Sequence, residues 1–369
     1  MRVSQCTPII KPSDSICNLS CAYCYMQGIM KGESVSSFMS IDTLRTLINF
    51  FCRDQPAVEF IWHGGEPLVV GIDFYRNVVE FQKTWLQKGV EIKNSMQTNA
   101  TLVTAEWASF LRENNFSVGV SLDGPQEVHD LMRHYAGGRG SYIEVMRGIG
   151  LLREAGIFNG ISCCVSSVNC GDPKGLLDFF ISQGMKSIKF LRVRGLDGRG
   201  NLYPGSISLD EYSAFLISIF YRWLELDDPE IEVRDIKSIV ELLLGGDFRE
   251  CVYMGKCYNF VTVYGDGSIY GCDALPRRDS LYFGNVKNHE GENLNFSKFI
   301  GIVESQKDAC KSCELFNICR GGCLQDRVPN IFSGESKNSA CQNIKDLCGE
   351  IASVLDKYGL APTTCARNK

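Results

Sequence analysis

The stretch ICNLSCAYCYM, residues 16–26, brings Cys17, Cys21 and Cys24 together in the spacing Cys-x3-Cys-x2-Cys. Three thiols cannot all pair as disulfides among themselves, because one is always left over. A closed structural zinc site wants four ligands, and the next histidine in the chain is as distant as His63. A four-iron cluster fits better, since three cysteines leave one iron open to a small molecule. The stretch therefore predicts an iron–sulfur site with an open position.

The whole chain has the composition of an ordinary globular protein. It has 369 residues, a net charge of −5, 44% hydrophobic residues and eighteen cysteines. The charge balance gives no basic field for nucleic acid, and neither a signal-peptide core nor a long apolar span for a membrane is present in the sequence. We therefore expect a cytoplasmic protein without nucleic-acid or membrane partners. Clustered cysteines in such a chain are expected to bind metal rather than form disulfides.

The first two hundred residues alternate between short β-rich runs and amphipathic helical stretches. Strands are predicted at 7–11, 58–63, 91–97, 116–122, 160–165 and 187–193, and helices at 40–52, 73–88, 104–114, 141–155, 174–183 and from 209 to about 226. This order predicts an α/β fold with parallel strands and right-handed crossovers, in either a doubly wound sheet or a barrel. In both, ligands collect at the carboxyl ends of the strands, where HGGEP, QTNA and SLDGP are expected to lie.

With Tyr23 before Cys24, the cysteine motif resembles the signature of the radical S-adenosylmethionine (SAM) superfamily. The resemblance implies a partial (β/α)6 TIM-like barrel over residues 1–230. It also implies that the amino and carboxylate groups of SAM chelate the open iron, and that reductive cleavage yields a 5′-deoxyadenosyl radical. The chemistry then belongs to the cofactor, and the protein supplies position and electronics.

The same resemblance implies a set of SAM contacts at the strand ends. They are Tyr23 in the cysteine motif, Gly64, Gly65, Glu66 and Pro67 in the turn after the second strand, Gln97, Thr98 and Asn99 after the third, Ser121 and Asp123 after the fourth, and Arg133. Alternatives from the residues alone stay open. The GGEP stretch can be an ordinary β–α turn, Asp123 a turn cap, and Arg133 half of a surface salt bridge.

Eight of the ten cysteines in residues 231–369 have a spacing that resembles the SPASM extension of radical SAM enzymes, here preceded by a linker. Eight cysteines are enough for two metal sites of four thiolates each. Such sites could hold iron–sulfur clusters, or alternatively the zinc ions of a double zinc ribbon. The resemblance assigns one auxiliary 4Fe–4S cluster to Cys251, Cys257, Cys272 and Cys323, and a second to Cys310, Cys313, Cys319 and Cys341. With the SAM cluster this gives three 4Fe–4S clusters.

The stretches QTNATL, SLDGPQEVHD and VMRGIGLL resemble anaerobic sulfatase-maturating enzymes and related peptide maturases. The resemblance implies hydrogen abstraction from a side-chain carbon, expected to be Cβ, of a peptide or protein substrate, with flavodoxin or ferredoxin as electron donor. Residues 274–285, ALPRRDSLYFGN, depart from the sulfatase-maturase pattern. We therefore expect a crosslink, such as a cyclophane, in a ribosomally made peptide. Formylglycine formation is the alternative, and a carbohydrate dehydrogenase or epimerase a further one.

Asp273 follows Cys272 directly and is the candidate general base of the reaction. A carboxylate in a water-poor pocket beside a cluster is expected to have the raised pKa that proton abstraction needs. A hairpin-capping role is the alternative. Since the cluster motif begins at Cys17, a peptide leader would be recognised by the core or by a separate leader-binding protein.

Overall fold

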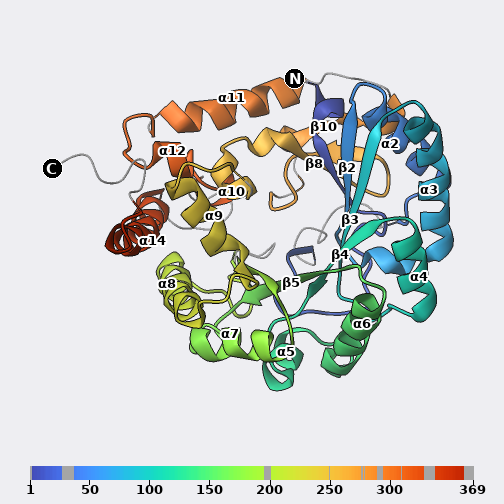
Figure 1. Cartoon of the computed structure of the whole chain (residues 1–369). Helices are drawn as coiled ribbons and strands as arrows, with labels where there is room; N and C mark the ends of the chain where they lie inside the picture. The colour runs from blue at the N-terminus through green and yellow to red at the C-terminus, as the bar shows by residue number, and fades with distance from the viewer. Residues whose placement is uncertain are drawn as a thin grey trace. The chain divides into compact units, whose positions relative to one another are not determined.

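The computed structural model of the protein describes residues 2–26, 37–194, 201–248, 250–275, 277, 279–288, 294–308, 310–327 and 337–360 (Figure 1). These residues form two compact units, each assembled from separate parts of the chain. The first unit contains Met1–Leu122, His129–Asn159 and Tyr258–Gly301, and the second contains Asp123–Val128, Gly160–Cys257 and Ile302–Lys369. The predicted boundary between two domains at residue 230 stays a prediction.

The first unit is built on a mostly parallel sheet with the strand order β10-β9-β8-β1-β2-β3-β4. Its strands are β1 (Thr7–Ile10), β2 (Ala57–Trp62), β3 (Glu91–Thr98), β4 (Phe116–Ser121), β8 (Phe260–Val263), β9 (Ser268–Tyr270) and β10 (Tyr282–Asn285). Strands β1 to β4 and β8 are parallel, whereas β9 pairs antiparallel with both β8 and β10. The carboxyl ends of β1 to β4 therefore lie at one edge of the sheet.

Four longer helices belong to this unit: α2 (Ile41–Cys52), α3 (Ile72–Gln87), α4 (Ala105–Glu113) and α6 (Tyr142–Glu154). Ser40 starts α2 because its side chain accepts a hydrogen bond from Thr43 N, and Thr104 starts α4 in the same way. The apolar stripe of α2, with Leu44 and Leu47, is fully buried. Figure 1 shows α2, α3 and α4 along one face of β2, β3 and β4, where they cover the strands from solvent.

The second unit contains the parallel strands β5 (Phe158–Val165), β6 (Ser187–Arg192) and β7 (Glu232–Val233). Its helices are α7 (Pro173–Ser182), α8 (Leu209–Leu226), α9 (Arg234–Leu243), α10 (Cys251–Met254), α12 (Phe316–Cys319), α13 (Leu324–Arg327) and α14 (Lys337–Lys357). Two more, α5 (Gln126–Met132) and α11 (Leu294–Asp308), contain residues of both units. A capping box of Ser208 and Glu211 starts α8, which packs against α7 and α14.

The six predicted strands and six predicted helices are present, with ends displaced by at most two residues. After residue 251 the described chain also contains two long helices, α11 and α14. In α14 the buried Leu347, Ile351 and Leu355 repeat at helical spacing, but they stand among cysteines and charged residues that obscure the pattern. In the described part of the chain, no helix has both the length and the apolarity to cross a membrane.

Candidate active site

The cysteine loop after β1 holds the three sulfurs of the opening motif. Leu19 N donates to Cys17 Sγ at 3.3 Å, and the Asn99 amide nitrogen lies 3.8 Å from the same sulfur. The pKa of the Cys17 thiol is raised to about 12, chiefly by burial, with smaller contributions from the nearby Glu66, Cys21 and Cys24, while the hydrogen bond from Leu19 lowers it. The three sulfurs are thus close enough to influence one another. A cationic cluster would reverse the shift and hold them as thiolates.

The donor set fits an iron–sulfur cluster in its chemistry. None of the cysteines among the described residues forms a disulfide, so the thiols of the loop are available as ligands. Within the same residues, no three Cys, His, Asp or Glu side chains converge closely enough to hold a single metal ion. A four-iron cluster is itself several ångströms across, so its ligand sulfurs stand apart rather than meet at one point.

The GGEP turn after β2 presses against the backbone that leads into the cysteine loop. Glu66 N donates to Ile16 O at 3.0 Å, and Ser13 Oγ donates to Gly64 O at 3.2 Å. Gly65 has φ +57°, and a Cβ atom there would stand 2.7 Å from Ser13 Oγ. Gly65 is therefore required by the close approach of two backbone segments, independently of any ligand.

The Glu66 carboxylate is buried and makes its hydrogen bonds within the protein. It accepts from Thr98 Oγ1 at 2.7 Å, Asn99 N at 2.8 Å and Leu68 N at 3.0 Å. Burial raises the pKa of Glu66, and these donors act against that shift. Pro67 begins a short 3₁₀ helix, Pro67–Val70. The carboxylate thus joins the predicted GGEP and QTN motifs to each other, and a contact with SAM remains a prediction.

The predicted residues at the ends of β3 and β4 are also brought together. Gln97 Nε2 donates to Ser121 Oγ at 3.1 Å. Asn99 Nδ2 donates to Asn18 Oδ1 at 3.0 Å, and Asn18 Nδ2 donates to Thr101 Oγ1 at 2.7 Å. Sequence reasoning missed Asn18 and Thr101, although Asn18 lies inside the cysteine motif. The QTN stretch therefore braces the cysteine loop through side-chain amides.

Tyr23 and Arg133 lie together in the first unit, where the guanidinium carbon is 5.4 Å from the ring centre. Arg133 is only 8% exposed, which disfavours the surface salt bridge considered above. Asp123 lies in the second unit, where its Oδ1 accepts a hydrogen bond from Cys164 N at 2.9 Å. That bond favours the structural interpretation of Asp123 over a ribose contact.

Asp273 lies at the centre of a charged cluster in the first unit. Its carboxylate forms an ion pair with Lys11, accepts a hydrogen bond from Tyr25 Oη at 2.7 Å, and lies 3.1 Å from His63 Nδ1. Burial alone would raise the pKa of Asp273, but Lys11 and His63 outweigh burial and hold it well below its usual range. The expected raised pKa of Asp273 is therefore wrong. Sequence reasoning missed its three partners, although Lys11 and His63 each directly follow a strand.

Three cysteines of the first predicted auxiliary site lie in the second unit, and Cys272 lies in the first. The pKa of Cys251 is raised to about 11, first by removal from water and then by the nearby sulfur of Cys323, with a smaller contribution from Cys257. Cys251 as a whole is exposed to solvent, whereas its thiol is surrounded by enough protein to raise the pKa. The sulfurs of Cys323 and Cys257 are therefore both near enough to Cys251 to raise its pKa.

Cys323 has a charged partner. Arg194 Nη2 lies 3.6 Å from Cys323 Sγ, and the same guanidinium forms an ion pair with Asp326. Arg192 also contacts Asp326, at 3.1 Å. Burial would lower the pKa of Arg194, but Asp326 and Cys323 outweigh it and raise the pKa. A fixed positive charge therefore stands beside this sulfur.

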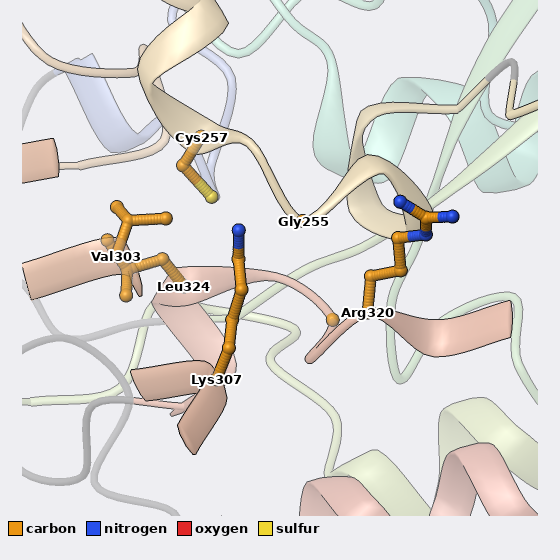
Figure 2. Close-up of a pocket in the computed structure, with 7 residues that line it drawn as sticks. Gly255, Cys257, Val303, Lys307, Arg320 and Leu324 are labelled. Carbon is orange, nitrogen blue, oxygen red and sulfur yellow. The ribbon is translucent and has the colours of Figure 1, made fainter. Parts of the chain in front are cut away.

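The second predicted auxiliary site is also in the second unit. Cys313 N donates to Cys310 O at 2.9 Å, so the Cys-x2-Cys pair forms the tight turn that its spacing predicts. Cys319 ends α12 and Cys341 is exposed on α14. Figure 2 shows a neighbouring small pocket in which Lys307 extends from α11 toward Cys257, with Arg320 also lining it. Lys307 is therefore a positive side chain near Cys257, and it also forms an ion pair with Glu304.

The chain is similar to known proteins of one superfamily. A profile of the radical SAM superfamily matches residues 15–172. The cysteine-type anaerobic sulfatase-maturating enzyme of Clostridium novyi (strain NT) is 31% identical, with 91% of this chain and 92% of that protein covered. The serine-type enzyme of Bacteroides thetaiotaomicron is 30% identical, with 94% and 90% covered.

The fold is also similar to that of solved structures. The structure described as native anSMEcpe with bound AdoMet matches with a TM-score of 0.85 and 28% identity, covering 95% of this chain and 98% of that one. The structure of SuiB from Streptococcus suis matches with a TM-score of 0.59 at 15% identity, covering 87% of this chain and 73% of that one, a likeness that shows the fold alone.

The fold and the cysteine loop define a radical SAM enzyme. Within that class, the chain belongs to the family of anaerobic sulfatase-maturating enzymes. The predicted fold class is thereby confirmed: an α/β fold of the radical SAM type, followed by a cysteine-rich region that fits a SPASM domain. The individual site residues remain predictions.

Proposed function

We propose that the protein oxidises a cysteine or serine side chain of a protein substrate to formylglycine, as an anaerobic sulfatase maturase. The observation that carries this proposal is the identity of 31% and 30% with a cysteine-type and a serine-type maturase over at least nine-tenths of the chain. Support also comes from a TM-score of 0.83 to anSMEcpe with bound AdoMet and the Cp18Cys peptide.

The residues that would hold the cofactors follow from the site. Cys17, Cys21 and Cys24 would bind the cluster that carries SAM, and the backbone of Gly64 and Gly65 would approach SAM itself. The cluster and SAM together would remove one hydrogen atom from the substrate. The protein's own residues then have to hold the side chain, exclude water and accept a proton. The second and third clusters and an electron donor such as flavodoxin or ferredoxin are part of the proposal.

Crosslinking of a ribosomal peptide, our expectation from the sequence, has weaker support, because it rests on the distant SuiB fold. A carbohydrate substrate has no support beyond the shared SAM chemistry. A separate leader-binding protein is expected only under the crosslinking hypothesis.

Product analysis distinguishes these activities. The anaerobically reconstituted protein, with reductant and SAM, would be given synthetic peptides that carry the sulfatase motif with cysteine or serine. We expect 5′-deoxyadenosine and an aldehyde that a hydrazide reagent traps. A product that has lost hydrogen but contains no trappable aldehyde would contradict formylglycine formation and favour a crosslink.

A further inference from the structure

The Asp273 carboxylate is engaged by donors on both oxygens. Oδ1 faces the ammonium of Lys11, while Oδ2 accepts from Tyr25 Oη at 2.7 Å and lies 3.1 Å from His63 Nδ1. All four residues belong to the first unit. The carboxylate is therefore held in place between an ammonium, a phenol and an imidazole.

Exposure increases along this cluster in one direction. The side chain of Lys11 is 0% exposed, that of Asp273 14% and that of His63 33%. His63 directly follows β2, at the sheet edge where ligands of parallel α/β folds bind, and precedes the GGEP turn. Of these three side chains, the imidazole is therefore the one most open to an incoming side chain.

The contact with Asp273 also determines the tautomer of His63. An ionised carboxylate can only accept hydrogen bonds, so the proton of the neutral imidazole is on Nδ1. The lone pair, which can accept a proton, is then on Nε2. A buried aspartate that fixes a histidine in this way is the arrangement by which imidazole acts as a general base in serine hydrolases.

We propose that His63 Nε2 accepts the proton that the substrate loses during oxidation, with Asp273 and Lys11 as positioning residues. This inference rests on the proposed function. In the balanced reaction, one hydrogen atom leaves Cβ to the SAM-derived oxidant and one electron leaves to an iron–sulfur cluster. The thiol or hydroxyl proton goes to Nε2, and the C–S or C–O bond becomes double. A serine gives the aldehyde directly. A cysteine gives a thioaldehyde, which water converts to the aldehyde with release of hydrogen sulfide.

The test separates hydrogen abstraction from proton removal. With a peptide containing Cβ-dideuterated cysteine, His63→Gln should still transfer deuterium into 5′-deoxyadenosine within about twofold of wild type, yet yield about a hundredfold less aldehyde, the scale of general-base catalysis. Millimolar imidazole should restore aldehyde in His63→Ala but not in Asp273→Asn. His134→Gln, which changes another histidine of the first unit, should behave as wild type.

A tautomer measurement on the protein without substrate gives an independent readout. In protein labelled with ¹⁵N-histidine, His63 should carry its proton on Nδ1, and Asp273→Asn should remove that preference. Unchanged aldehyde yield in His63→Gln, or loss of deuterium transfer together with aldehyde, would overturn the proton-accepting role. Deuterium transfer without aldehyde in the wild type would instead contradict formylglycine formation, and the yield of the alternative product would then test His63.

Discussion

The two cysteine regions are held by different kinds of interaction. In the loop that contains Cys17, neutral amide and hydroxyl groups of Asn18, Asn99 and Thr101 form a chain of side-chain hydrogen bonds. In the C-terminal field, charged groups stand beside the sulfurs, with Arg194 at Cys323. Neutral hydrogen bonds define position with little effect on charge, whereas a buried cation also favours an electron-rich sulfur. The difference suggests that the first region is built for geometry and the second for electron affinity.

The largest expected effect tests whether the regions are separable. Replacing Cys17, Cys21 and Cys24 with alanine should abolish 5′-deoxyadenosine formation and remove about a third of the iron if three clusters are present. Iron analysis and product quantification measure both. Cys52→Ala, at a buried cysteine on α2, is the control and should retain iron and activity. Loss of all iron in the triple variant would contradict independent sites.

The next prediction concerns the close approach at Gly65. Gly65→Ala should disrupt the cysteine loop, because its Cβ would overlap Ser13 and Ile16, and iron at this site should fall with SAM cleavage. Gly71→Ala is a matched control, since Gly71 has φ +86° with nothing near its Cβ position. The control should cost only backbone strain, roughly 1–3 kcal/mol in the free energy of unfolding measured with denaturant, because φ +86° with ψ +158° is a conformation almost restricted to glycine. Equal effects of the two changes would contradict the steric argument.

How far the sequence predicts this molecule depends on the kind of feature. The strands before Lys11 and His63 were predictable, because periodicity reports which face of an element is buried. The cluster around Asp273 was not, since it joins residues 11, 25, 63 and 273, and no local pattern encodes so distant a contact. The expected pKa of Asp273 was wrong for the same reason: burial was foreseeable, but the contacts with Lys11 and His63 were not.

Glu66 gives a smaller and more specific prediction about the first region. Glu66→Gln keeps the shape but replaces one of the accepting oxygens with an amide group facing a donor. We expect the free energy of unfolding to fall by roughly 1–3 kcal/mol, the range for a lost buried hydrogen bond. Denaturant titration and the KM for SAM together decide its role. A raised KM with unchanged stability would show a SAM contact instead of a brace.

The smallest expected effect lies in the second region and tests its electrostatic character. Arg194 stands 3.6 Å from Cys323 Sγ, and Asp326 fixes its guanidinium. Adding an electron to a cluster held by this sulfur increases negative charge, which the guanidinium stabilises, so wild type should have the higher reduction potential. Arg194→Gln removes that charge and should lower the potential by roughly tens of millivolts, where 59 mV is a tenfold change for one electron. Spectroscopically monitored redox titration measures the potential.

Arg222→Gln, in an exposed ion pair on α8, is the control and should leave the potential unchanged. An unaltered potential in Arg194→Gln, with iron content preserved, would mean that the guanidinium only braces Asp326, and the proposed division between geometry and electron affinity would then fail.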